Sequence, residues 1–176
     1  TNMCLTILGV VEKLNTLPDD FFKDGMGEVI KYGCIKSKNL FEKLEKINSR
    51  EEFMRKSEEI IFECCDIKRK VVEEDEKDLG IRAILNFGHT YGHALEKKYN
   101  FSGLSHGMAV AIGMCYITRI SEQEGMTEKG TFERVVNLCK KYGLPTTDIA
   151  KPQELLEGIG KDKKNLGRSE ERRVGK

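Results

Sequence analysis

The residues best suited to chemistry are three histidines, His89, His93 and His106, and the chain has no others. His89 and His93 are four residues apart, so on a helix their side chains lie on the same face. His106 precedes an apolar segment, and an antiparallel pair of helices would return it toward the first turn of the earlier helix. Neutral imidazoles that converge with a carboxylate are suitable ligands for Zn²⁺. The spacing predicts a metal site, but it does not decide which two histidines bind or which carboxylate joins them.

Ordinary structural roles compete with this interpretation. A single histidine on a helix is more often a core or surface residue than a ligand, and only the third histidine gives the two interpretations similar weight. In the segment GMGEVIKYG (25–33), Glu28 and Lys31 are three residues apart, for which an exposed ion pair is the ordinary explanation. The lysines of KDKKN (161–165) form either a solvated charge run or a site for a phosphate or carboxylate.

The elements that must position these residues are all predicted to be helices. Pro18 suits a helix start, Gly33 a helix end, and Ser49 with Glu52 has the spacing of a capping box. We find no β alternation and no G-x-G-x-x-G loop. The predicted helices cover residues 18–32, 38–47, 49–80, the second part of 82–99, 107–121 and 131–142, with a short last helix from Pro152.

Two of these helices have informative apolar patterns. The segment 107–121 is apolar on most sides, which predicts a buried central helix. In the helix from Ser49, Lys68 lies four residues after Cys64 and three before Val71, so it shares their apolar face. Such a lysine either extends its charge to solvent or lines a polar site.

Composition limits the classes of function. The 176 residues carry a net charge of +1, contain no Trp and are 7% aromatic, so nothing indicates a nucleic-acid partner. No apolar run is long enough to span a bilayer. The six cysteines lack a C-x-x-C pair and lie mostly among apolar residues, which is typical of reduced thiols in a cytoplasmic protein.

Four segments resemble the 3-dehydroquinate synthase family: GMGEVIKYG (25–33), LNFGHTYGHALE (85–96), LSHGMAVAIGM (104–114) and KDKKN (161–165). The resemblance covers about residues 13–166 and implies an all-α, metal- and substrate-binding C-terminal domain. In that family a Rossmann-like N-terminal domain binds NAD. Residues 1–12 would then be the stub of a preceding NAD-binding domain, and the charged residues 167–176 an atypical, possibly non-native tail.

The resemblance implies an activity. The family converts 3-deoxy-D-arabino-heptulosonate 7-phosphate into 3-dehydroquinate and phosphate in the shikimate pathway, with NAD and a divalent metal. A small sugar phosphate is therefore the expected partner, in a cytoplasmic protein whose full-length form is a homodimer. Because the NAD domain is missing, we expect the chain alone to lack full activity. Gly27 stands where the family often has Ala, and a helical glycine costs about 0.5–1 kcal/mol relative to Ala.

The resemblance also implies a role for individual residues. It makes the ligands of Zn²⁺ or Co²⁺ a different set from the pair suggested by spacing: Glu28, His89 and His106. The expected catalytic residues are His93, Asn86 and Lys31. The expected substrate contacts are the cations Lys68, Arg82, Lys161 and Lys164. A strip before the first helix would touch NAD, formed by Lys13, Leu14, Asn15 and Thr16.

Three alternatives remain open at the level of sequence. Another sugar-phosphate cyclase, of the inosose or valiolone synthase type, would share the metal site and differ in its substrate contacts. An iron- or zinc-dependent alcohol dehydrogenase has a similar two-domain plan, but EVIKYG (28–33) followed by the lysine-rich segment argues against it. A non-catalytic helical fragment would keep the fold without the chemistry.

Overall fold

The computed structural model describes residues 14, 16–77, 80–100 and 103–148. Within these residues every regular element is a helix, which confirms the predicted all-α class. The elements are α2 (Asp19–Ile35), α3 (Lys38–Lys46), α4 (Arg50–Glu74), the short 3-10 helix η1 (Ile81–Asn86), α5 (His89–Lys98), α6 (His106–Gln123) and α7 (Thr131–Lys141). The predicted helix from Pro152 and the segments 1–12 and 167–176 lie outside the described residues.

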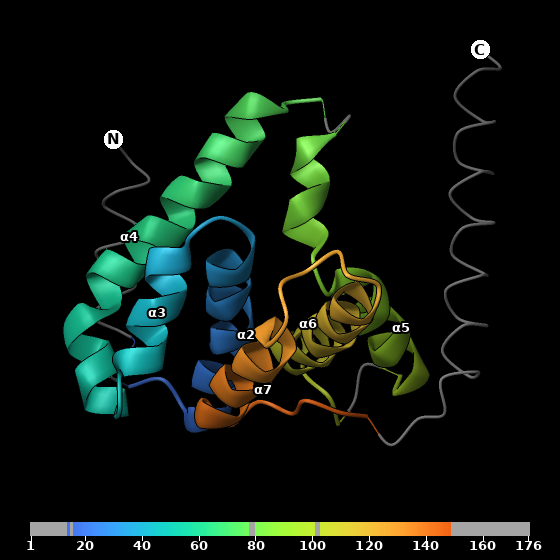
Figure 1. Ribbon diagram of the computed structural model, residues 1–176. Coiled ribbons are helices and arrows are strands. Elements are labelled where there is room, and N and C mark those ends of the chain that lie inside the picture. Colours follow the sequence, from blue (N-terminus) through green and yellow to red (C-terminus); the bar gives the residue numbers. More distant parts are fainter. Residues whose placement is uncertain (1–13, 15, 78–79, 101–102, 149–176) are drawn as a thin grey trace, which may run out of the picture.

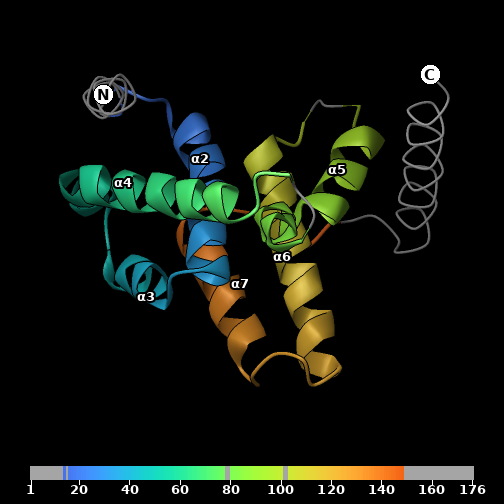
Figure 2. The same ribbon diagram turned by 90° about the horizontal axis from the view of Figure 1, so that it is seen from above.

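Two helices, α2 and α6, lie at the centre of the fold. They pack against each other, and α6 also packs against α5 and α7 while α2 packs against α3, α4 and α7 (Figure 1). Seen from above, α3 and α4 lie on one side of α2, and α5 lies beyond α6 on the opposite side (Figure 2). The chain segments that carry the histidines, α5 and the start of α6, are therefore adjacent.

The predicted burial of α6 is confirmed. The residues from Ala109 to Cys115 are all buried, and Val110 and Met114 join the main core while Ala109 and Ile112 join a smaller cluster with Leu95 of α5. A fully buried side chain of the size of valine, isoleucine or methionine contributes about 1.5–3 kcal/mol to stability. Apolar packing on opposite faces of α6 thus holds α2 and α5 on either side of it.

The start of α4 follows the predicted capping box. The Ser49 hydroxyl oxygen accepts a hydrogen bond from the Glu52 N–H at 3.1 Å. The Glu52 carboxylate accepts one from the Asn48 N–H at 2.9 Å, one residue before the cap rather than at the cap itself. The two contacts satisfy N–H groups that have no partner within the helix.

The predicted end of the first helix at Gly33 was wrong by two residues, because α2 continues to Ile35. A Cβ atom on Gly33 would lie 3.2 Å from the backbone of Phe41 in α3. The glycine therefore permits close packing of α3 against α2 within the helix and does not terminate it.

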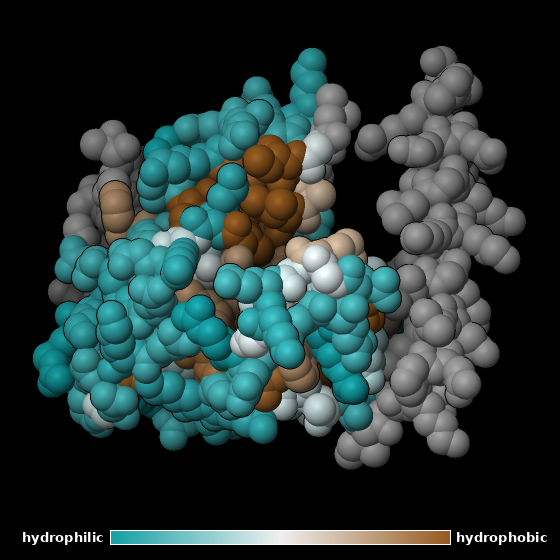
Figure 3. Space-filling model, in the orientation of Figure 1, coloured by the Kyte–Doolittle hydropathy of each residue, from teal (hydrophilic) through white to brown (hydrophobic). Residues whose placement is uncertain are grey.

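The long helix ends at Glu74, before the predicted end near Gly80. The carboxylate of Asp75 turns the chain there, since it accepts hydrogen bonds from the N–H groups of Gly80 at 2.8 Å and Arg82 at 3.0 Å. Between α4 and η1, apolar side chains gather in one area of the surface (Figure 3).

The state of the cysteines and the apolar character of the helices agree with the expectations from composition, which were reduced thiols and no membrane-spanning segment. The five cysteines in the described part of the chain are free thiols, and three of them, Cys64, Cys115 and Cys139, are buried. Among the described helices, none combines the length and the apolar character needed to cross a membrane.

Candidate metal centre

Two glycines let α2 and α6 approach closely at the site. A Cβ atom on Gly27 would lie 2.8 Å from the Cα of Gly107, closer than real side chains come. The Asp24 carboxylate accepts a hydrogen bond from the Gly107 N–H at 2.5 Å, where a negative charge is favourable at the start of α6. Glu28 follows Gly27 and His106 precedes Gly107, so this close contact places Glu28 beside His106.

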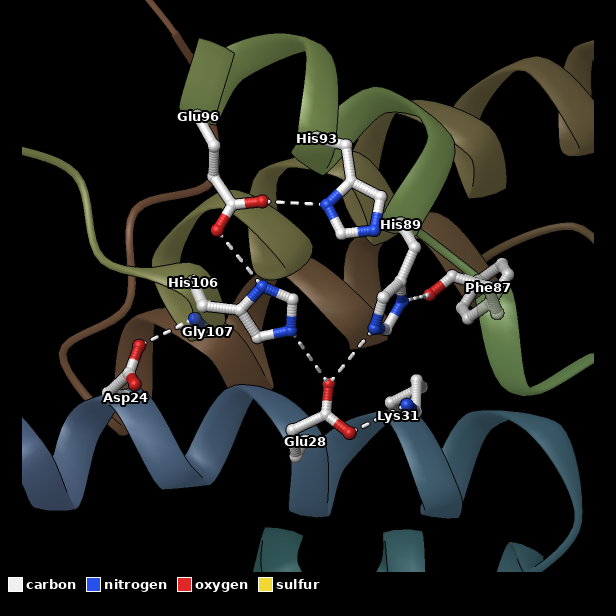
Figure 4. A network of polar contacts seen from close by, with 9 residues as sticks. All are labelled: Asp24, Glu28, Lys31, Phe87, His89, His93, Glu96, His106 and Gly107. Atoms are coloured by element: carbon white, nitrogen blue, oxygen red, sulfur yellow. Dashed lines mark hydrogen bonds and ion pairs between the residues drawn. The ribbon is translucent and has the colours of Figure 1, made fainter. Parts of the chain in front are cut away.

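One oxygen of Glu28 faces two imidazole nitrogens (Figure 4). Glu28 Oε1 lies 3.4 Å from His89 Nε2 and 3.6 Å from His106 Nε2. The three ligand atoms all lie within 4.8 Å of one another. Around a tetrahedral zinc, ligand atoms are roughly 3.3 Å apart, as follows from metal–ligand lengths of about 2.0–2.1 Å. The observed spacing therefore fits a divalent ion with little rearrangement.

The same carboxylate oxygen is also a buried acceptor without a hydrogen-bond partner among the described residues. A buried polar atom of this kind carries a substantial cost in free energy unless something satisfies it. Glu28 Oε1, together with two imidazole lone pairs, has the donor chemistry that suits Zn²⁺. The residues present therefore fit the metal that the sequence predicts.

Hydrogen bonds on the far side of each ring determine which nitrogen carries the proton. His89 Nδ1 lies 3.2 Å from the carbonyl oxygen of Phe87, and His106 Nδ1 lies 3.1 Å from Glu96 Oε1. Both partners are acceptors, so each neutral ring holds its proton on Nδ1. The lone pair of each Nε2 is then directed toward Glu28, as metal binding requires.

A buried lysine completes the electrostatics of Glu28. Lys31 is only 3% exposed, and its ammonium lies 2.6 Å from Glu28 Oε2. Burial alone would raise the pKa of Glu28, but its electrostatic interactions with His89 and Lys31 outweigh burial and lower that pKa to about 2. Glu28 is therefore an anion at neutral pH. The exposed ion pair that spacing alone suggested for Glu28 and Lys31 was wrong, because α2 buries the lysine against the other helices.

His93 belongs to the same cluster but not to the group around Glu28. Its Nδ1 lies 2.7 Å from Glu96 Oε2, and its ring centroid is 5.5 Å from that of His89 and 5.8 Å from that of His106. His93, Glu96 and His106 form a second group of possible metal ligands. Helical spacing left open whether His89 acts as a ligand together with His93. The structure instead directs His89 and His106 toward the same oxygen of Glu28.

The other predicted catalytic and substrate-binding residues lie on η1 and α4 or outside the described residues, and within the described part of the chain no hydrogen bond or ion pair joins them to the histidines. Asn86, at the end of η1, lines a hollow of about 620 Å³ together with Ile84, Phe87 and Thr90. Arg82 is half-buried and donates to the Glu76 carbonyl oxygen at 3.4 Å. Lys68 is exposed on α4, which agrees with a charge that reaches solvent from an apolar face.

The predicted NAD strip is described at two of its four residues. Leu14 and Thr16 precede α2, and the Leu14 carbonyl oxygen accepts a hydrogen bond from the Leu17 N–H at 3.2 Å. The roles predicted for these two residues stay predictions. The other two residues of the strip and two predicted substrate contacts lie outside the described residues: Lys13, Asn15, Lys161 and Lys164.

Sequence reasoning assigned no role to Asp24 or Glu96. Asp24 lies four residues before Glu28, and Glu96 three residues after His93, so each shares a helical face with a predicted site residue. That spacing is a weak signal, since such pairs are common on any helix. Their contacts with Gly107 and His106 connect different helices, and only the fold shows them.

Fold and site together define a class: an all-helical domain in which one carboxylate and two histidines from three helices converge as candidate ligands of a divalent metal. Comparison with known proteins agrees with this class. Residues 25–165 match the family model described as 3-dehydroquinate synthase C-terminal. The chain belongs to this family.

Relatives called 3-dehydroquinate synthase match most of the chain. The protein from Clostridium perfringens (strain 13 / Type A) is 58% identical over 154 residues, which cover 87% of this chain and 44% of the relative. The protein from Streptococcus sanguinis (strain SK36) is 43% identical over 161 residues, covering 90% of this chain and 45% of the relative. The chain thus spans less than half the length of these relatives.

A solved structure has a similar fold. It is ValA (2-epi-5-epi-valiolone synthase) from Streptomyces hygroscopicus subsp. jinggangensis 5008, with NAD⁺ and Zn²⁺ bound. The TM-score is 0.76 at 19% sequence identity, over 86% of this chain and 43% of that one. At this identity the likeness concerns the fold alone.

Proposed function

We propose that this chain is the metal- and substrate-binding domain of a 3-dehydroquinate synthase. The enzyme would convert 3-deoxy-D-arabino-heptulosonate 7-phosphate into 3-dehydroquinate and phosphate, with NAD as a catalytic oxidant. The observation that carries the proposal is the convergence of Glu28 Oε1 with the Nε2 atoms of His89 and His106. The names of the relatives in Clostridium and Streptococcus support it.

In this proposal Glu28, His89 and His106 hold Zn²⁺ or Co²⁺. Three protein ligands leave a coordination position open, as in catalytic rather than structural zinc sites. When bound, the ion would polarise a substrate hydroxyl and favour its oxidation by NAD. Lys31 holds the second oxygen of Glu28, which leaves Oε1 directed toward the histidines.

The chain's own side chains would do the remaining work. His93 presents a half-exposed ring whose Nδ1 is held by Glu96, so its Nε2 is available to accept or return a proton. Asn86 would position the substrate. The phosphate and carboxylate of the substrate require cations, which the following residues would supply: Lys68, Arg82, Lys161 and Lys164. NAD would touch the strip from Lys13 to Thr16.

The metal site can be tested directly on the chain. We expect about one equivalent of Zn²⁺ per chain, with affinity lowered at least 100-fold in Glu28→Ala and His106→Ala. His93→Ala is the matched control, because its ring lies in the same cluster but does not face Glu28 Oε1; we expect it to lose tenfold or less. A chain that binds no metal would support a non-catalytic helical domain.

The activity needs the rest of the enzyme. We suggest replacing the matching C-terminal part of the Clostridium perfringens relative, which is 58% identical, with this chain. We expect the chimera to release phosphate from the heptulosonate phosphate in the presence of NAD and Zn²⁺, and His89→Ala in the chimera to abolish the release. Turnover of sedoheptulose 7-phosphate or glucose 6-phosphate in its place would identify a different sugar-phosphate cyclase. The homodimer and the cytoplasmic location also remain part of the proposal.

A further inference from the structure

We propose that Glu96 is a positioning residue that holds His93 and His106 through the two oxygens of one carboxylate. The inference rests on the proposed metal site, because it assigns the group that orients one ligand of that site. It also connects that ligand to the histidine proposed for proton transfer.

The contacts of Glu96 divide its two oxygens between two helices. Oε2 lies 2.7 Å from Nδ1 of His93, one turn earlier on α5, and Oε1 lies 3.1 Å from Nδ1 of His106 at the start of α6 (Figure 4). Glu96 is only 8% exposed, so water competes little for these oxygens. A carboxylate accepts hydrogen bonds and donates none, so both oxygens of Glu96 are in use as acceptors.

The consequence for His106 is a defined tautomer. Because Glu96 can only accept, the neutral ring keeps its proton on Nδ1 and its lone pair on Nε2, which faces Glu28. His89 reaches the same state by a different contact, since its Nδ1 donates to the backbone carbonyl of Phe87. One ligand is thus oriented by the main chain and the other by a side chain that substitution can change.

The consequence for His93 is parallel. Its ring also keeps a proton on Nδ1, and its side chain is 56% exposed, so the basic Nε2 can meet a substrate. The carboxylate therefore serves both the metal ligand and the proton-transfer histidine, which come from different helices.

The isosteric variant Glu96→Gln separates this role from packing. A glutamine keeps the shape but has one acceptor oxygen and one donor NH₂ group. The NH₂ group can meet a ring nitrogen only if that nitrogen carries the lone pair. At least one of His93 and His106 must therefore move its proton to Nε2 or lose its contact, while His89 is unaffected.

The first measurement is long-range ¹H–¹⁵N NMR of the metal-free chain at a slightly alkaline pH, where neutral imidazoles prevail. In the wild type we expect all three rings to carry the proton on Nδ1. In Glu96→Gln we expect a changed tautomer for His93, for His106 or for both, and an unchanged one for His89. This readout needs neither metal nor activity, and loss of packing alone would not select these two rings.

The second measurement is the affinity for Zn²⁺ by competition with a chelating dye. We expect Glu96→Gln to weaken binding about 10–100-fold, as typically found for groups that orient metal ligands. Glu96→Asp, which keeps both acceptors on a shorter side chain, should recover part of the loss. The matched control is Glu122→Gln: Glu122 also uses both oxygens, for the N–H groups of Gly130 at 3.0 Å and Phe132 at 2.8 Å, but far along α6. It should leave Zn²⁺ affinity unchanged.

Two results would overturn the inference. Wild-type tautomers and Zn²⁺ affinity in Glu96→Gln would show that Glu96 orients neither ring. Binding of two Zn²⁺ per wild-type chain, with loss of only one in Glu96→Gln, would make Glu96 a ligand of a second metal site. If the wild type binds no Zn²⁺ and Glu96→Gln still shows the expected tautomer changes, the proposed metal site is wrong and the positioning role of Glu96 is supported.

Discussion

Gly27 on α2 and Gly107 on α6 lie back to back, with no room for a side chain between them. The residues beside them along the chain, Glu28 and His106, thereby come within 3.6 Å through Oε1 and Nε2. The packing of two helices and the geometry of the candidate metal centre are thus one feature. A glycine at position 27 is what this close contact requires.

Adding a methyl group at Gly27 should separate the two helices. We expect Gly27→Ala to lower the free energy of unfolding by about 1–3 kcal/mol, since overpacking outweighs the better helix propensity of alanine. Zn²⁺ affinity should fall as well, because Glu28 moves away from His106. Gly25→Ala is the matched control on the same helix: nothing lies within 4 Å of its Cβ position, so it should stabilise by about 0.5–1 kcal/mol. Urea unfolding measures the stability of both variants. Equal stabilisation by Gly27→Ala and Gly25→Ala would contradict the close contact between Gly27 and Gly107.

The lowered pKa of Glu28 predicts a dependence of stability on pH. Its folded-state pKa of about 2 lies below the ordinary value of 4.5, so the ionised group contributes stability that is present above pH 4.5 and is lost as the pH falls toward 2. We expect the free energy of unfolding of the metal-free wild type to decrease more steeply over this window than that of Glu28→Gln. Urea titrations at several pH values measure both slopes. Parallel slopes would mean that Glu28 is not held as an anion.

Removing the buried cation should be costly. Lys31→Met leaves the second oxygen of Glu28 without its partner, so we expect a loss of about 1–3 kcal/mol in the free energy of unfolding. The matched control is Lys38→Met, which removes an exposed pair with Glu42 at 3.8 Å and should cost less than about 0.5 kcal/mol. Thermal and urea unfolding compare the two. If both variants lose a similarly small free energy of unfolding, the Lys31–Glu28 pair contributes no more than an ordinary surface ion pair.

Metal binding should stabilise the folded chain. At a free Zn²⁺ concentration 100 times the Kd, the gain is about 2.7 kcal/mol, which for a chain of this size corresponds to roughly 5–10 °C in Tm. We expect EDTA to reverse the shift, and His106→Ala to show almost none of it. Differential scanning calorimetry with and without Zn²⁺ makes the measurement. An equal shift in His106→Ala would place the stabilising ion elsewhere.

The sequence by itself determined where most of the helices lie and which residues form the motifs. The apolar character of residues 107–121 on most sides located the buried helix, and Ser49 with Glu52 located the start of α4, because these signals depend on residues within a few positions. The ends of α2 and α4 were misjudged, since Gly33 and Asp75 act through contacts with Phe41, Gly80 and Arg82. Resemblance then indicated which residues should bind metal.

The tertiary structure decided what those residues can do. Helical spacing showed that His89 and His93 share a face, but not that the Nε2 of His106 joins His89 at Glu28, nor that Glu96 spans two helices. It also left Lys31 as a surface cation, and packing buried it. The physical reason is that local rules act over one or two turns of a helix, whereas a metal centre needs atoms from three helices within a few ångströms. That convergence depends on which faces pack, and here on two glycines that let the backbones touch.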